Sequence, residues 1–154
     1  MRTAVFATIL FLLAGNVLAE PKPWMKKENP EELRVVLSVP GCRGDFEGVV
    51  DGALARARIK RATNSNPGEL LAVVEVLCLD IGAGRYAFAY GVHFGRILSG
   101  DGIHDNDIVV YSLSGAASVG AIPDSAVGRQ QLEQTIRDYF EKLLADYLKA
   151  NFDL

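Results

Sequence analysis

The stretch Tyr86–Leu98, YAFAYGVHFGRIL, alternates between large apolar side chains and mostly small ones. Alternation with a period of two is typical of a β-strand, because successive side chains point to opposite faces of a sheet. The large side chains predict the face that packs against the rest of the domain: Tyr86, Phe88, Tyr90, Val92 and Phe94. The intervening residues predict an open face that is a candidate for binding a partner: Ala87, Ala89, Gly91, His93 and Gly95.

The segments on either side of this strand complete a β-α-β-β-β-α order. Apolar, β-branched runs between turn signals predict strands over Leu33–Val39, Leu70–Leu79 and Ile108–Leu113. Apolar residues at helical spacing predict helices over Asp45–Lys60 and from Pro123 to about Ala150. The order predicts an α+β fold, a four-stranded mixed sheet with two helices packed on one face. The first two strands are expected to be parallel neighbours joined by the helical crossover.

The composition fits one folded domain. The chain has 154 residues, of which 49% are hydrophobic and 23% are charged, so a disordered or collagen-like chain is excluded. It carries 16 Lys and Arg against 19 Asp and Glu, a formal net charge of −3. This balance argues against nucleic-acid binding, which needs an excess of positive charge.

Residues 1–19 have the pattern of an export signal. Arg2 precedes an apolar run, and Val17-Leu18-Ala19 is a small-residue cleavage site. The run is shorter than the roughly 20 apolar residues that a membrane span needs. We therefore expect cleavage after Ala19 and a periplasmic or secreted mature chain without a transmembrane segment.

The mature chain is expected to begin with a tether. Residues 20–32 are rich in proline and charge and lack periodicity, which predicts a flexible segment. Loose packing is favoured for Trp24 and Met25, and docking on the domain or on a partner is the alternative. Residues 33–154 are then a single α+β domain.

Cys42 and Cys78 are the only cysteines of the chain. In an exported protein an even number of cysteines predicts disulfide pairing. A redox pair or a metal site are the alternatives, but the sequence has neither a C-x-x-C spacing nor a supporting cluster of Cys and His.

Candidates for chemistry are few. Asp101, Asp105 and Asp107 are weak candidates for a Ca²⁺ site, although their spacing does not match the Ca²⁺-binding loop motif. His93 and His104 are the only histidines and are candidates for a general base. A polar loop explains the aspartates and His104 more simply, and His93 on the small-residue face has too few partners for a metal site, so neither a metal nor a cofactor is expected.

Several segments resemble a group of small exported bacterial proteins of unknown function. The resemblance is carried by LARARI at 54–59, LLAVVEV at 70–76, VY at 110–111, SVG at 118–120, IRDYF at 136–140 and DYLKAN at 146–151. The expected architecture is also similar to the lipopolysaccharide-assembly lipoprotein and related envelope accessory domains, which implies binding rather than catalysis. The chain departs from that family at Glu20, which stands where the lipid-bearing Cys would be.

The favoured function is therefore that of a non-enzymatic exported accessory protein. Its open sheet face or a sheet edge is expected to bind an unknown envelope protein or a second copy of the chain. The alternative is a small-molecule or lipid binder that holds its ligand between helix and sheet, near the aromatic side chains. A hydrolase that uses His93 or His104 is a third, less favoured hypothesis.

Overall fold

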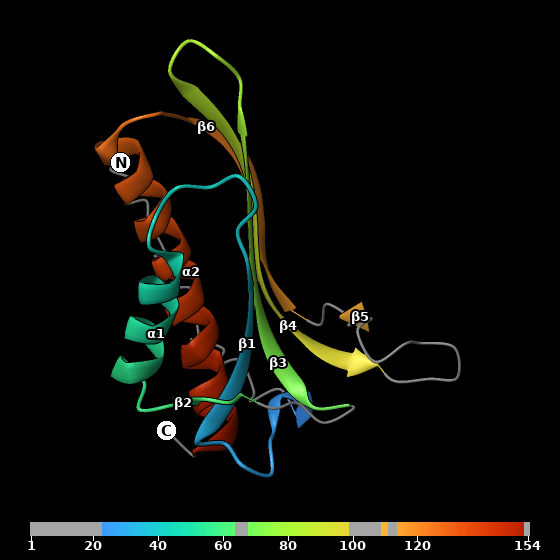
Figure 1. The fold of residues 1–154 in the computed structure, drawn as a ribbon. Coiled ribbons are helices and arrows are strands. Elements are labelled where there is room, and N and C mark those ends of the chain that lie inside the picture. Colours follow the sequence, from blue (N-terminus) through green and yellow to red (C-terminus); the bar gives the residue numbers. More distant parts are fainter. Residues whose placement is uncertain (1–22, 64–67, 99–108, 111–113, 153–154) are drawn as a thin grey trace, which may run out of the picture.

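The structure is a computed structural model that describes residues 23–63, 68–98, 109–110 and 114–152. Its elements follow one another as η1 (Pro23–Met25), β1 (Glu32–Ser38), α1 (Phe46–Arg56), β2 (Lys60–Arg61), β3 (Leu70–Asp80), β4 (Arg85–Leu98), β5 (Val109–Val110), β6 (Ser114–Pro123) and α2 (Ala126–Asn151) (Figure 1).

The strands form one mixed sheet. A path of five strands runs β2-β1-β3-β4-β5, and β6 pairs with β4 off this path, so the sheet has six strands. β1 lies parallel to β2 and to β3, whereas β4 lies antiparallel to β3, β5 and β6. The predicted α+β class and the parallel pair joined through α1 are confirmed. The predicted count of four strands is wrong, because the two-residue strands β2 and β5 extend the sheet.

The last strand lies later in the chain than predicted. The sequence favoured Ile108–Leu113, but the long partner of β4 is β6, in the Ser-, Gly- and Ala-rich segment that follows. Gly120 shows why small residues suit this strand. It pairs with Phe88, and a Cβ at Gly120 would lie 2.7 Å from Cζ of the Phe88 ring. The large ring on β4 therefore requires a small residue opposite it.

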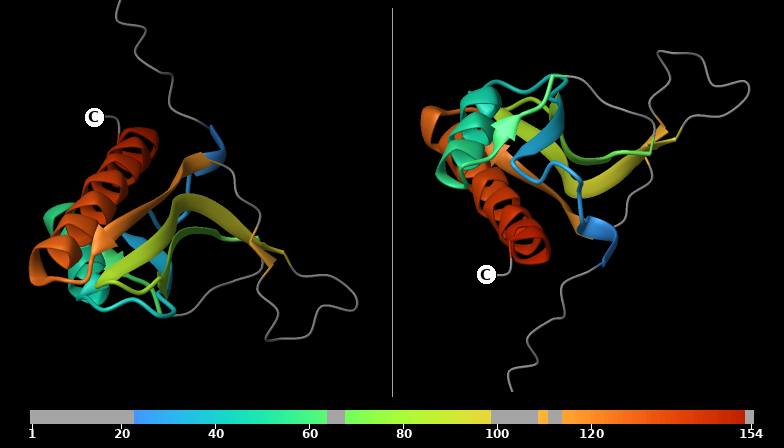
Figure 2. Two further views of the ribbon diagram at one scale, coloured as in Figure 1. Left: turned by 90° about the horizontal axis from the view of Figure 1, so that it is seen from above. Right: turned by 90° about the horizontal axis from the view of Figure 1, so that it is seen from below.

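Both helices lie on the same side of the sheet, as predicted (Figures 1 and 2). The large residues of β4 are buried beneath them, with Tyr90, Val92 and Phe94 at most 7% exposed. The Phe94 and Tyr147 ring centroids are 6.0 Å apart. The helices contribute the other half of this core through buried residues of α1 (Phe46, Val49, Val50, Ala53, Leu54) and α2 (Leu132, Ile136, Phe140, Leu143, Leu144, Tyr147).

The helix boundaries follow from local capping. Asp45 caps α1 by accepting a hydrogen bond from the Gly48 N–H at 2.9 Å, and Ser125 caps α2 through the Gly128 N–H at 3.1 Å. α1 ends at Arg56, before the predicted Lys60. The cause is Arg58, whose φ of 57° is left-handed and stops the helix.

The segment that precedes β1 is docked on the domain. Met25 is 1% exposed, and Trp24 packs edge-on against Phe94 with ring centroids 6.2 Å apart. Asn151 at the end of α2 accepts a hydrogen bond from the Lys27 N–H at 2.9 Å and donates one to the Met25 carbonyl at 3.0 Å. This differs from the loose packing that the local composition suggested for Trp24 and Met25. Both residues pack against the core where β4 and α2 meet.

Cys42 and Cys78 form the predicted disulfide, with their Cα atoms 4.8 Å apart. The bond joins the loop after β1 to β3. The Cys78 N–H also donates to the Pro40 carbonyl at 3.0 Å. The intervening Gly41 has a φ of 74°, and a Cβ there would lie 2.3 Å from the Cys78 carbonyl oxygen. The loop therefore reaches β3 only because residue 41 is glycine.

Candidate binding site on the open sheet face

The side of the sheet away from the helices, called the open face below, is built from rows of paired residues. Directly paired residues point to the same side, so the register of β3, β4 and β6 fixes which side chains share a row. Three successive rows are Leu79, Ala87 and Ala121; Leu77, Ala89 and Val119; and Glu75, Gly91 and Ala117.

The exposed apolar surface of this face comes from its flanking strands. Leu77 is 55% exposed, Leu79 is 65% exposed and Val119 is 78% exposed. Ala87 and Ala89, between them on β4, are half-buried. The small residues of β4 thus form the floor of a shallow trough, and the larger side chains of β3 and β6 form its walls.

The structure places all five residues predicted for this face on the side away from the helices. Gly91 and His93 are half-buried like the two alanines, and Gly95 is buried. Leu77, Leu79 and Val119 were not predicted as part of the site. The alternation within β3 that could have revealed the leucines is hidden, because the strand is apolar on both faces.

A cavity of about 420 Å³ lies on the open face. It is lined by Ser38, Pro40, Glu75, Val76, Leu77, Ala89, Tyr90, Gly91, His93 and Ala117. Its volume is within the range of sites that hold small molecules or protruding side chains of a partner. Gly91 helps to form this cavity because it has no side chain to fill the space between His93 and Glu75. His93 Nδ1 and Glu75 Oε2 lie 3.6 and 3.8 Å from the place that a Cβ on Gly91 would take.

Ser38, Glu75 and His93 line the same cavity, which raises the question of a hydrolase site. Ser38 pairs directly with Glu75 across β1 and β3, and His93 lies on β4 beyond them. Neighbouring strands are about 4.8 Å apart, so the backbones that carry Ser38 and His93 are separated by about 10 Å. In a serine hydrolase the histidine bridges the serine and the carboxylate. Here the carboxylate stands between the other two, an order that does not match such a triad.

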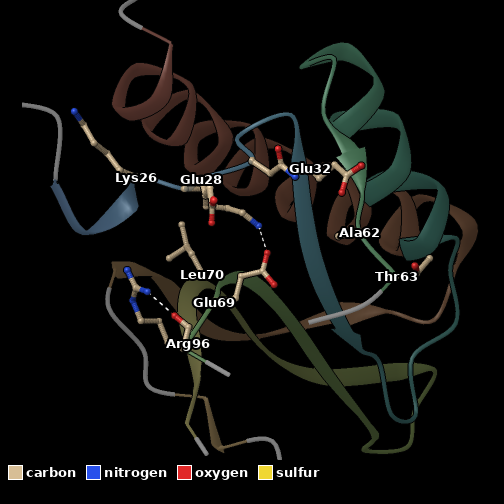
Figure 3. Close-up of a pocket in the computed structure, with 11 residues that line it drawn as sticks. Lys26, Glu28, Glu32, Ala62, Thr63, Glu69, Leu70 and Arg96 are labelled. Carbon is tan, nitrogen blue, oxygen red and sulfur yellow. Dashed lines mark hydrogen bonds and ion pairs between the residues drawn. The ribbon is translucent and has the colours of Figure 1, made fainter. Parts of the chain in front are cut away.

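A second cavity, of about 540 Å³, lies beside the docked N-terminal segment (Figure 3). Lys27 forms an ion pair with Glu69 across it, and the Lys27 side chain is only 5% exposed. Arg96 donates to the Gly68 carbonyl and, at 2.8 Å, to the Trp24 carbonyl. These contacts tie the N-terminal segment to the ends of β3 and β4, so we assign these charged groups a structural role.

The covered face holds two phenols with raised pKa values. Burial, reinforced by Tyr139, raises the pKa of Tyr90 to about 12, and a hydrogen bond with Ser118 opposes the shift. Burial, followed by the negative charge of Glu69, raises the pKa of Tyr147 well above its usual range. Its hydroxyl donates to the Pro30 carbonyl at 2.9 Å. Both phenols are neutral at physiological pH and act as packing groups.

The remaining candidates for chemistry lie outside the described residues. Asp101, Asp105, Asp107 and His104 all fall in residues 99–108, so the Ca²⁺ and His104 hypotheses stay predictions. Among the residues that the structure does describe, no group of three or more His, Cys, Asp or Glu could hold a metal ion. In the same part of the chain, no helix combines the length and apolar character needed to cross a membrane.

Comparison with known proteins yields no family for this chain, since neither a family model nor a curated protein matches it. Weakly similar solved structures include two lipoproteins. A minor lipoprotein from Acinetobacter baumannii matches at 13% identity and a TM-score of 0.33, over 75% of this chain and 87% of the other. A lipoprotein from Caulobacter crescentus matches at 13% identity and a TM-score of 0.27, over 78% and 83% of the two chains. With TM-scores below 0.5, neither likeness assigns a family or an activity.

Proposed function

We propose that the protein is an exported, non-enzymatic accessory protein that binds another protein of the cell envelope through its open face. The observation that carries the proposal is the exposed apolar surface of Leu77, Leu79 and Val119, which a folded domain ordinarily buries against a partner. Export is supported by the signal pattern of residues 1–19 and by the disulfide, because such bonds persist in oxidising compartments.

In-cell photo-crosslinking tests this proposal. A photoreactive residue at position 79 lies on the open face, and one at Lys142 lies on the exposed side of α2 as a matched control. We expect a defined protein adduct from position 79 and none from position 142. Equal adducts from both positions, or none from position 79, would contradict binding through this face.

A matched pair of substitutions then tests whether the trough itself is needed. Ala89→Arg fills the trough between Leu77 and Val119, whereas Ala145→Arg places the same side chain on the exposed side of α2. We expect Ala89→Arg to abolish the adduct from position 79 while the circular dichroism spectrum stays that of the wild type. Ala145→Arg should leave the adduct intact. An adduct that survives Ala89→Arg shows that the trough is not the site.

A small-molecule or lipid ligand is the second candidate, and the 420 Å³ cavity on the open face favours it. The sequence placed such a ligand between helix and sheet, near the aromatic side chains, where the structure has a much smaller cavity. The cavity beside Tyr86 and Leu132 has a volume of about 10 Å³. Native mass spectrometry of the protein purified from its own cells distinguishes the candidates, since a bound small mass supports this one.

A further inference from the structure

The two edges of the sheet are protected to very different degrees. The edge at β1 is covered in part by β2, carries Glu32 and Arg34, and is followed by Pro40. Among the strands that the structure describes, β6 pairs only with β4, and residues 117–121 are exposed. Its residues from Ser114 to Ile122 include no charged residue and no proline, the features that ordinarily prevent an edge from pairing.

The hydrogen bonds that flank β6 show which of its backbone groups are unpaired. The Asp124 N–H donates to the Gly84 carbonyl at 2.7 Å, so Gly84 and Asp124 form a hydrogen-bonded pair. The next pair along the ladder is Arg85 and Pro123. In an antiparallel ladder such pairs alternate with pairs that exchange no bonds. Even-numbered residues of β6 therefore bond to β4. The odd-numbered residues direct their N–H and C=O groups outward: Ala117, Val119 and Ala121.

A second hydrogen bond supports the same assignment from the other side of β4. The Ile81 N–H donates to the Arg85 carbonyl at 3.1 Å, so odd-numbered residues of β4 bond to β3 and even-numbered residues bond to β6. Pro123, which has no N–H to donate, occupies one of the outward positions of β6. The outward groups of Ala117, Val119 and Ala121 thus form a regular set that another strand can pair with.

This set is self-complementary. If a second copy approaches antiparallel with the two-fold axis at Val119, Val119 of one copy faces Val119 of the other, and Ala117 faces Ala121. Each of these pairs exchanges two hydrogen bonds, as in any hydrogen-bonded pair of an antiparallel ladder. A symmetric contact of this kind closes on itself and forms a dimer rather than a filament.

The symmetry of the outward residues, Ala117, Val119 and Ala121, favours a second copy as the occupant, and the charge distribution along the edge permits it. The chain carries a formal net charge of −3, so two copies repel one another in general. The edge strand itself has no charge, and the contact therefore places no like charges opposite each other. It also covers Val119, which at 78% has the largest exposed fraction of the large hydrophobic residues that the structure describes.

We propose that two copies of the chain form a symmetric dimer through antiparallel pairing of their β6 strands, centred on Val119. The dimer does not rest on the function proposed above. It covers Val119 of the open face, leaves Leu77 and Leu79 uncovered, and joins the open faces of the two copies into one continuous sheet surface.

Charge variants at the two-fold axis test the proposal by sedimentation velocity with the chain expressed in full. Val119→Lys and Val119→Glu each place like charges face to face, so we expect the dimer to weaken at least about tenfold in both. An equimolar mixture of the two variants places Lys opposite Glu and should restore a dimer containing one copy of each. Leu79→Lys, two strands away on the open face, is the matched control and should remain dimeric.

Each contrary result overturns the proposal. A wild-type chain that stays monomeric at about 100 µM does not pair in this way. A dimer that dissociates in Leu79→Lys and persists in Val119→Lys is formed through the open face instead. A mixture that fails to restore the dimer excludes an axis at Val119. Val119→Pro provides a second probe, because it removes the outward N–H, leaves the bonds to β4 in place and should also give a monomer.

Discussion

The two faces of this sheet are made of similar apolar side chains but differ in how much of each is covered, since on the open face Val73 is 3% exposed while the rows at Leu77 and Leu79 are bare. On the covered face, Phe94 is 0% exposed and Val92 is 1% exposed beneath the helices. On the open face, Leu77 and Leu79 of the neighbouring strand are more than half exposed. The difference arises because the described residues form two α-helices, and both pack on one side (Figure 1). Apolar character alone therefore does not identify the core, because burial also requires a helix that packs over the strand.

The largest effect is expected from truncation in the covered face. Phe94→Ala removes a ring that packs against Trp24 and Tyr147, so the free energy of unfolding should fall by about 3–5 kcal/mol. Urea denaturation at equilibrium measures this. A loss below about 1 kcal/mol would show that the covered face is not a packed core.

The disulfide closes the covered side of the sheet at the end opposite the docked N-terminal segment. Replacing Cys42 and Cys78 together by Ala should lower the free energy of unfolding by about 2–4 kcal/mol, because the unfolded chain gains the entropy that the cross-link removes. Urea denaturation of this variant, beside wild type with and without reductant, provides the measurement. Reductant should destabilise the wild type and leave the double variant unchanged; the reverse pattern contradicts a structural disulfide.

Alkaline pH tests the burial of Tyr90. Its pKa is raised in the folded state from 10.0 to about 12, so above pH 10 the unfolded chain releases this proton first. The contribution to stability is complete below pH 10 and is lost as the pH rises toward 12. Tyr90→Phe should therefore show a shallower decline of the urea midpoint between pH 9 and 11 than the wild type. Identical declines would place Tyr90 in contact with solvent.

The smallest effect is expected on the open face. Leu79→Ser removes a side chain that is 65% exposed, so the free energy of unfolding should change by no more than about 0.5 kcal/mol. The same urea titration provides the comparison with Phe94→Ala. A loss of more than about 2 kcal/mol would mean that Leu79 is packed within the chain.

The sequence predicted which side chains face the core where large and small residues alternate along a strand. In Tyr86–Leu98 the large and small side chains alternate, so both faces of β4 could be assigned. In β3 the apolar run is continuous, and nothing in it distinguishes the buried Val74 from the exposed Leu77. Their difference depends on which side the helices cover.

Other features depended on contacts between distant segments. Gly120 and its neighbours have weak β-propensity, and they form a strand because β4 supplies large residues opposite them. Trp24 and Met25 lie in a polar, proline-rich stretch, and their docking requires the end of α2 and Phe94. The open face was predicted from β4, but its exposed leucines on β3 were not.

Radical footprinting of the isolated protein tests the central claim, which is that the helix side of the sheet is covered while the other side is bare at Leu77 and Leu79. Hydroxyl radicals generated by a brief laser pulse label side chains according to their access to solvent. We predict strong labelling of Leu77 and Leu79 and almost none of Val92 and Phe94, with the contrast lost on unfolding in urea. Protection of Leu77 and Leu79 at the level of Val92 would contradict the account.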